Sequence, residues 1–340
     1  MTTNIDDAVR HAANLLAFTR HRGREQGASE PSFLDQAIER HDTAVLYRSL
    51  MDGFSYQGIS DAVAQNFVAK HGNSEWSEIQ RMLEHSGAER CPKLESFHSF
   101  SACGYRKSSH ICANMATLPS CPVPTLPLRK GVLNQQAFAL YLLIRDICGG
   151  DLVQYIDQIL AIAKCEPDPV TTGREALLAL FTSITGVSRK LASMMLATIL
   201  LAASNSRQDW TSVGSSMVAI DSLVHNHLHR TGILRVYCAE HRYGEHCAGN
   251  QGCERIVRDL AARLGCSTSS ANAMSPRQLQ HAIWRFCAGS ELNICNGNRM
   301  DDKAPCRQIH CPVGHGCARM VLKPLLSDST SSFGPLAAGS

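Results

Sequence analysis

The stretch that decides the fold is SITGVSRKLASMM, residues 183–195, in which a glycine turn and a lysine separate two apolar segments. Upstream lies EALLALF (175–181), and downstream residues 191–203 are helix-forming and almost wholly apolar. Gly186 supplies a tight turn at little steric cost, and Ser188 is a good N-cap for the second helix. The stretch predicts two helices joined by a hairpin whose free backbone N–H groups suit a phosphate. An ordinary helical hairpin without a ligand is the alternative.

Lys190 lies in the first turn of the second helix, next to Arg189. The positive end of the helix dipole and the neighbouring guanidinium both disfavour an ammonium group at this position. A lysine held as a neutral amine is a nucleophile at neutral pH. We therefore predict a nucleophilic Lys190, with a solvated surface lysine as the alternative.

Most of the remaining chain has apolar residues spaced three to four apart, which is typical of amphipathic helices. The expected helices cover residues 9–18, 33–50, 59–68, 76–83, 138–147, 152–162 and 176–184. Alternating strand patterns are scarce, so the sequence predicts an all-α protein. Three stretches interrupt the pattern: a linker at 21–32, a Cys- and Pro-rich insertion at about 88–130, and a tail at 326–340 that we expect to be disordered.

Composition sets limits on the class of partner. The chain has 340 residues, and its 33 basic and 30 acidic side chains give a formal net charge of only +3, which permits nucleic acid as a partner without arguing for it. No apolar run is long enough to cross a bilayer, and residues 1–10 lack the apolar core of a secretory signal. We expect a cytoplasmic protein without a membrane partner.

Fifteen cysteines accompany fifteen histidines, and in a reducing compartment such thiols are better read as metal ligands than as disulfides. Two sets of four stand out: Cys91, Cys103, Cys112 and Cys121, and Cys295, Cys306, Cys311 and Cys317. A weaker third group comprises Cys238, Cys247, Cys253 and Cys266, near His241 and His246. We predict that Cys148, Cys165 and Cys287 are small buried apolar residues. For His225, His227 and His229 we predict a solvated or nucleic-acid-facing surface rather than a metal site.

A second segment, MVAIDSLVHNHLHRTG (217–232), places Asp221 after an apolar run and at the start of another helix. Together with the hairpin it resembles the endonuclease III-like, helix-hairpin-helix DNA glycosylases, which carry a PGVGRK-type hairpin, then an apolar run ending in VD and a helix closing in arginine. The matching residues are Gly186, Val187, Arg189, Lys190, Ile220, Asp221 and Arg230, joined by Ser55 and Gln57 of an early helix and by Trp284 and Gly289 ahead of Cys295. The resemblance covers most of residues 43–320.

The resemblance implies a base-excision-repair glycosylase with abasic-site lyase activity. Lys190 would attack the sugar C1′ of an extruded nucleotide, expel the base and form a Schiff base that leads to strand cleavage by β-elimination. Asp221 would stabilise the cationic sugar, and Gln57 would fill the space of the flipped base. The neighbouring phosphate would be held by Gly186, Ser188 and Arg189. The expected partner is double-stranded DNA with a damaged or modified base, bound by a monomer.

Three features depart from the family pattern. Thr185 and Ser188 replace the usual proline and second glycine of the hairpin. The segment between Lys190 and Asp221 is longer than usual, which makes Asp209 a rival carboxylate, although SRQDW lacks the apolar lead-in. We prefer Asp221.

Metal ligands follow from the same resemblance. Cys295-x10-Cys306-x4-Cys311-x5-Cys317 would hold a structural 4Fe–4S cluster, with zinc as the alternative because four thiolates accept either. The first two spacings are longer than in the family. For Cys91, Cys103, Cys112 and Cys121 we predict a second metal site of open identity, because the insertion lacks other means of ordering itself.

The implied architecture is the helix-hairpin-helix DNA glycosylase fold, with two helical domains flanking a cleft, a Cys-rich insertion and a C-terminal iron–sulfur cluster loop. The first, a six-helix-barrel-like domain, would cover residues 43–217, and the second would combine residues 1–42 with 218–325. Lys190 and Asp221 would face each other across the cleft. One alternative is a non-catalytic, metal-stapled DNA-binding or lesion-sensing protein of the same fold. A metal-dependent nuclease is disfavoured, because the sequence shows no carboxylate cluster suited to two divalent ions.

Overall fold

The computed structural model describes residues 4–21, 33–59, 61–85, 91–114, 121–203, 207–266, 274–297 and 299–322. The expected linker, beyond His21, and the expected disordered tail lie outside these residues. The described chain is mostly helical, which confirms the all-α class, and its strands form a single short antiparallel pair. Within the same ranges no helix is both long and apolar enough to cross a membrane.

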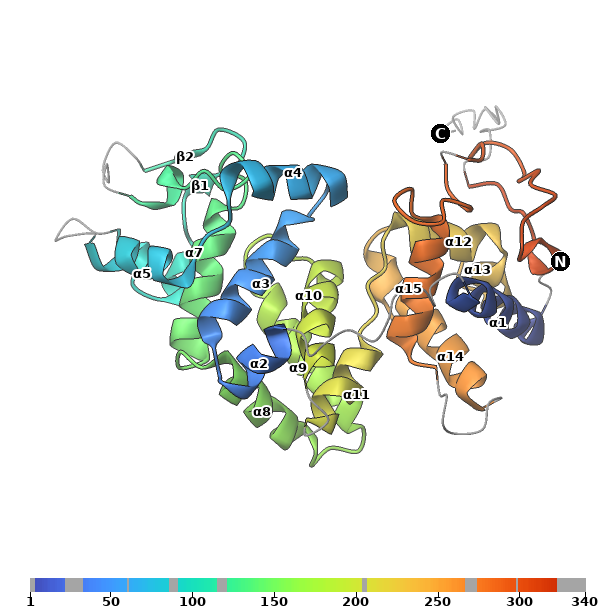
Figure 1. The fold of residues 1–340 in the computed structure, drawn as a ribbon, viewed down its shortest axis with the longest axis horizontal. Helices are drawn as coiled ribbons and strands as arrows, with labels where there is room; N and C mark the ends of the chain where they lie inside the picture. The colour runs from blue at the N-terminus through green and yellow to red at the C-terminus, as the bar shows by residue number, and fades with distance from the viewer. Residues whose placement is uncertain are drawn as a thin grey trace, which may run out of the picture.

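The helices form two units that lie side by side (Figure 1). The first unit contains α2 (Phe33–Glu39), α3 (Thr43–Ser55), α4 (Asp61–His71), α5 (Trp76–His85), α6 (Phe97–Phe100), α7 (Asn134–Leu142), α8 (Leu152–Ala163), α9 (Pro169–Thr182), α10 (Arg189–Ala202) and α11 (Gln208–Ser216), with strands β1 (Tyr105–Arg106) and β2 (Ile111–Cys112). The second contains α1 (Ile5–His21), α12 (Ser222–Arg230), α13 (Ile233–Val236), α14 (Cys253–Cys266) and α15 (Pro276–Cys287).

Each unit has its own hydrophobic core. The first core runs from Leu34 to Met217, and the second joins residues of α1 to residues from Val218 onward. Along the chain the change from the first core to the second falls between Met217 and Val218. The structure differs for α2, which we expected in the second unit, because Leu34 and Ile38 are buried in the first core.

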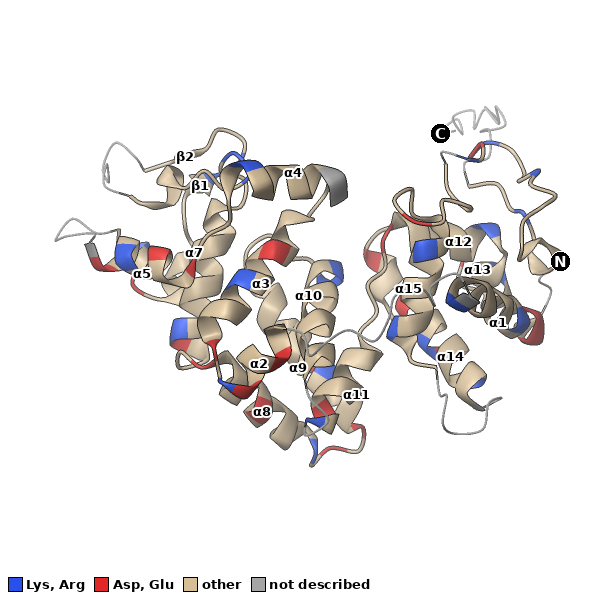
Figure 2. Ribbon diagram, viewed as in Figure 1, with Lys and Arg blue, Asp and Glu red and all other residues tan. Residues whose placement is uncertain are grey.

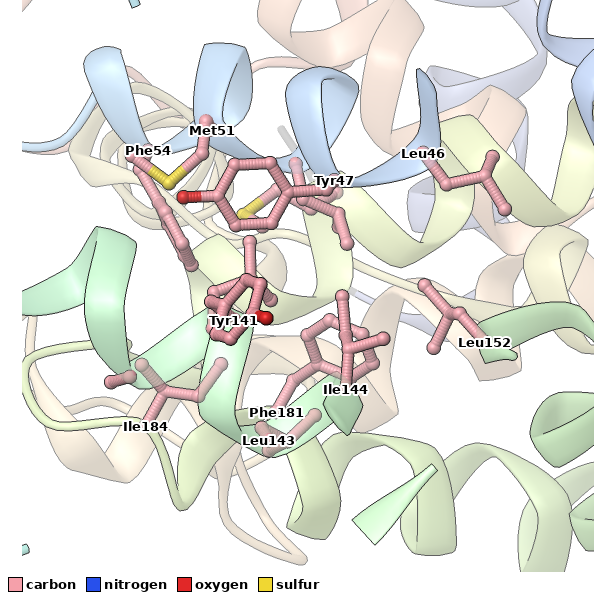
Figure 3. Close-up of a cluster of buried hydrophobic side chains, with 14 of the residues drawn as sticks. Leu46, Tyr47, Met51, Phe54, Tyr141, Leu143, Ile144, Leu152, Phe181 and Ile184 are labelled. Atoms are coloured by element: carbon pink, nitrogen blue, oxygen red, sulfur yellow. The ribbon is translucent and has the colours of Figure 1, made fainter. Parts of the chain in front are cut away.

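The first core is built around α3, α7 and α9. Figure 3 shows Tyr47 and Phe54 of α3 beside Tyr141 of α7, with Phe181 of α9 below them. The Tyr47 hydroxyl donates to the carbonyl of Ala137 (3.2 Å), so its burial leaves no unsatisfied polar group. Burying each of these large side chains stabilises the unit by about 1.5–3 kcal/mol.

The single helix expected at 33–50 is divided into α2 and α3. His41 adopts a left-handed backbone conformation (φ 54°), which ends α2. Asp42 then caps α3, since its carboxylate accepts from the Val45 N–H at 3.1 Å. The apolar periodicity of the sequence continues across this three-residue break and therefore does not reveal it.

The Cys- and Pro-rich insertion packs onto the first core. Leu94, Phe100 and Leu126 are buried in it. The buried amide of Asn134 donates to the carbonyls of Val123 (2.9 Å) and Leu126 (2.6 Å) and so pins the end of the insertion to α7. The expectation that only a metal could order this segment is therefore wrong, because the insertion shares the core of the domain that carries it.

Candidate active site

The predicted hairpin joins α9 to α10. Ile184 is buried under the turn, and Gly186 has a φ of +82°, a conformation that only glycine adopts without strain. The Ser188 hydroxyl accepts from the Leu191 N–H (3.3 Å), as the N-cap assignment requires. The hairpin therefore fixes the start of α10, where Lys190 lies.

A cavity of about 990 Å³ lies between the two units and contains both principal candidates. Lys190 of α10 lines the cavity on one side. Asp221, the residue directly before α12, also lines it. The remaining lining residues come from α3, α10, α12 and α15 and from the segments beside them: Ser49, Asp52, Gly53, Tyr56, Ile59, Met194, Met195, Thr198, Ala219, Ser222, Leu223, Arg277, Gln280, His281, Trp284, Ala288, Gly289 and Ser290. The rival Asp209 lies outside this lining and pairs with Lys164 at 2.5 Å.

Asp221 is the N-cap of α12 as well as a wall of the cavity. Its carboxylate accepts from the Val224 N–H at 2.8 Å. Burial raises the pKa of Asp221 above its ordinary value of 3.8, while the Val224 N–H and the positive charge of Lys190 act in the opposite direction. The two side chains are therefore close enough to interact electrostatically.

One face of α15 lines the cavity with a polar and aromatic stripe. Arg277, Gln280, His281 and Trp284 lie at positions i, i+3, i+4 and i+7. The rings of His281 and Trp284 are stacked, with centroids 5.6 Å apart. Burial, and after it the nearby Arg277, lowers the pKa of His281, which favours a neutral ring. The sequence analysis identified only Trp284 among these four residues, although their spacing of three or four residues is visible in the sequence.

Gln57 lies against the hairpin instead of the cavity. Its amide donates to the Gly186 carbonyl at 2.5 Å, and Gln136 donates to the Gln57 side-chain oxygen at 2.9 Å. Arg129 donates to the backbone carbonyl of Gln57 at 2.6 Å. The role of Gln57 in filling the space of a flipped base stays a prediction.

Arg189 forms a network of ion pairs between the two units. Its guanidinium binds the Glu175 carboxylate through two 2.8 Å hydrogen bonds and contacts Glu254 of α14 at 3.1 Å. The arrangement favours a structural tie over the phosphate contact that we expected. These two carboxylates also compensate the positive charge of Arg189, which lies next to Lys190 in the sequence.

The insertion brings a different cation to the hairpin. A Cβ on Gly186 would lie 2.7 Å from the Nζ of Lys107, so this ammonium group sits directly over the turn. Burial, and after it the nearby Arg129, lowers the pKa of Lys107. Two cations therefore crowd beside the hairpin, and an anion bound there would relieve their repulsion.

The C-terminal cysteine set is only partly gathered. Burial, and after it the thiols of Cys295, Cys311 and Cys306, raises the pKa of Cys317 to about 11, so the four share one neighbourhood. Their sulfurs nevertheless do not form a close ligand group among the described residues. Cys295 instead lies with His227 and Cys287, whose ligand atoms are within 4.8 Å of one another. Cys287, which we expected to be only a small buried residue, is thus a potential ligand.

The four cysteines of the insertion are also only partly gathered. Burial, and after it the thiols of Cys112, Cys103 and Cys91, raises the pKa of Cys121 to about 11. The four thiols therefore lie near one another, but within the described chain they too are spread more widely than the donors of a single ion.

Two of the three histidines of α12 are buried, and His229 is partly exposed. His225 and His227 are 4% and 1% exposed, so the predicted solvated or nucleic-acid-facing position is wrong for both. His225 forms a second close group with His241, Cys247 and Cys253. Cys238, by contrast, is exposed, and the side chain of Cys266 lies outside the described part of the chain. The described residues therefore contain two Cys/His groups that could hold a metal ion, and neither is a set that the sequence predicted.

Comparisons with family models, with curated proteins and with solved structures find no match to this chain. The likeness to helix-hairpin-helix glycosylases thus depends on the motifs of residues 183–195 and 217–232. What the site can do is argued below from its own geometry.

Proposed function

We propose that this chain is a DNA glycosylase with abasic-site lyase activity. The observation that carries the proposal is that Lys190 and Asp221, contributed by different units, line one cavity next to a helical hairpin. An amine and a carboxylate in one cavity are the groups needed to attack a sugar carbon and to stabilise the cation that develops there.

In the proposed reaction the Lys190 amine attacks C1′ of an extruded nucleotide and the C1′–N bond to the base breaks. Asp221 stabilises the positive charge on the sugar as the base departs. The proton that the amine loses passes to the departing base, and opening of the sugar ring leaves a Schiff base. Removal of a proton from C2′ then expels the 3′ phosphate by β-elimination and cuts the strand. The cavity size is typical of sites that enclose a small ligand.

The remaining cavity wall suits a nucleobase. The stacked rings of His281 and Trp284 offer an aromatic surface, and bases in flipped-out pockets are commonly held by stacking and by hydrogen bonds to their edges. Gln280 and Arg277 lie on the same face of α15 and supply hydrogen-bonding groups. These residues are the proposed determinants of which base is removed.

Metal binding in this proposal is structural. Cys295, Cys306, Cys311 and Cys317 share one neighbourhood without forming a close group in the described chain, which suits a 4Fe–4S cluster better than one zinc ion, because a cluster spreads its thiolates over separate iron atoms. Zinc on His227, Cys287 and Cys295 is the alternative. Either the 4Fe–4S cluster or the zinc ion would hold the C-terminal loop against the helices of the second unit.

The test is a panel of duplex oligonucleotides, each with one lesion and one of them with an abasic site, assayed with and without EDTA. We expect strand scission of the abasic duplex and at least one base lesion, insensitive to the chelator, with covalent trapping by borohydride. Binding without scission would instead identify a lesion-sensing module. Scission that requires a divalent ion would identify a nuclease.

Replacing Lys107 with alanine should weaken DNA binding equally for all sequences. The residue sits over the hairpin turn, where a phosphate would bind, so its loss removes about one counterion-releasing contact. The slope of log K against log salt should become shallower by about one unit. Lys164→Ala is the matched control, because Lys164 is exposed and paired with Asp209. Equal slopes for both variants would argue against a phosphate at the hairpin.

A further inference from the structure

Four ligand-type side chains from three separated segments meet in the second unit. His225 comes from α12, His241 and Cys247 from the segment after α13, and Cys253 from the first residue of α14. The Nδ1 of His225 lies 3.4 Å from the Cys253 sulfur and 3.5 Å from the Cys247 sulfur. The Nε2 of His241 lies 3.4 Å from the Cys247 sulfur and 3.5 Å from the Cys253 sulfur.

These separations are those of a tetrahedral zinc site. Bonds of about 2.3 Å to sulfur and about 2.05 Å to nitrogen, at a tetrahedral angle, separate the two ligand atoms by about 3.5 Å. All four sulfur–nitrogen distances agree with this value. Two thiolates and two imidazoles in tetrahedral array are a donor set that favours zinc.

The surroundings orient the ligands. The Nδ1 of His241 lies 2.6 Å from the Ala239 carbonyl, to which only an N–H can donate. This hydrogen bond fixes the tautomer and leaves the Nε2 lone pair directed at the two thiols, as in many metal-bound histidines. Three of the ligands, His225, Cys247 and Cys253, are buried, and His241 is half-buried.

The segment between the two cysteines is shaped to bring them together. A Cβ on Gly252 would lie 2.6 Å from the Cys247 carbonyl oxygen and closer still to that of His246. Only glycine lets the chain fold back so tightly just before Cys253. Close packing of this kind serves to align the cysteines.

We propose that His225, His241, Cys247 and Cys253 bind one structural zinc ion. With four protein ligands the site has no open position for a substrate, so it is not catalytic. The ion connects the long segment between α13 and α14 to the first turn of α12. Since α12 begins directly after Asp221, the zinc also fixes the helix that carries the proposed catalytic carboxylate, and that last consequence rests on the proposed function.

The test is the metal content of the purified full-length chain and of the double variant Cys247→Ser/Cys253→Ser, measured together with iron. We expect the variant to lose one zinc per chain, to keep its iron and to unfold at a lower temperature. Cys238→Ser is the matched control, because Cys238 is exposed in the same segment and outside the ligand group. Cobalt substituted for zinc should give the visible absorption of a tetrahedral sulfur–nitrogen site in the wild type and the control only.

Full zinc content in the folded double variant would overturn the proposal. So would a zinc-free wild type in which mass spectrometry finds Cys247 and Cys253 oxidised to a disulfide. If the double variant does not fold, His241→Ala gives the same measurement, since His241 is only half-buried. Because these readouts need no DNA, they succeed or fail independently of the glycosylase assay.

Discussion

Lys190→Ala should abolish covalent trapping of an abasic duplex by borohydride and lower strand scission by about 10³-fold or more. Borohydride captures only an imine between the enzyme and the sugar, and alanine has no amine with which to form one. Lys190 is the lysine of the cavity lining, so among the described residues no second lysine stands at the cavity to replace it. Trapping is measured as a protein–DNA band that survives denaturing electrophoresis.

Lys190→Arg separates catalysis from simple phosphate binding. Arginine keeps the positive charge of the side chain, so a residue that only contacts phosphate would retain most of its DNA affinity. A guanidinium does not form the trapped imine, and a nucleophilic lysine would therefore lose all trapping in this variant. Lys190 is half-buried in the first turn of α10, and we expect both variants to stay within about 0.5 kcal/mol of the wild-type stability. Full trapping by either variant would show that the nucleophile lies elsewhere.

The parts of this site that the sequence predicted are those fixed by short-range chemistry. Gly186 and Ser188 specify a turn and a cap within a few residues, and both take the predicted conformation. Asp221 likewise caps α12 through a hydrogen bond three residues along the chain. The break at His41 and Asp42 is also fixed by local chemistry, but the apolar pattern continues across it and predicts one helix.

Long-range packing decided what the sequence did not show. The alternation of His225 and His227 along a short segment predicts a surface position, but α1, α14 and the segment after α13 cover both side chains. Grouping cysteines by proximity in the sequence placed Cys247 and Cys253 with Cys238, whereas the fold completes the group with a histidine from another helix. No local pattern encodes that choice.

Which charged side chains are free to bind a ligand also depends on the fold and is not evident from the sequence. Basic and acidic residues are interspersed over the ribbons of both units (Figure 2), so the net charge of +3 does not single out a DNA-binding face. Arg189 looked available for phosphate, yet Glu254 of α14 reaches it across the two units. Lys107, in a segment that we could not match to the family, takes the place over the hairpin instead.

Asp221→Asn should reduce the excision of a base by about 10²-fold or more while leaving the fold intact. The amide loses the negative charge that would stabilise the cationic sugar. Asparagine is as good an N-cap as aspartate, so the hydrogen bond from the Val224 N–H is retained. Asp221→Ala should lose the cap as well and destabilise the protein by about 1 kcal/mol, which separates the two roles of the residue.

The pH dependence supplies a further readout. Burial raises the pKa of Asp221 above 3.8, and the active form is the carboxylate, so wild-type activity should fall on the acid side with a midpoint above that value. Because the folded state binds this proton more tightly than the unfolded state, this group's contribution to stability is full below pH 3.8 and is lost as the pH rises through the folded pKa. At neutral pH the asparagine variant should therefore unfold at the same temperature as the wild type or higher.

Asp52 provides the internal comparison, because it is a second carboxylate of the same cavity and is held by the Asn73 amide at 2.7 Å. Its hydrogen bond fixes it on the α3 side, and Asp221 is the carboxylate whose pKa the charge of Lys190 influences. Asp52→Asn should therefore lower the excision rate less than Asp221→Asn does and should leave the acid limb of the pH profile in place. If Asp52→Asn removed that limb and Asp221→Asn did not, the two carboxylates would have to exchange roles, and α3 would carry the charge that stabilises the sugar.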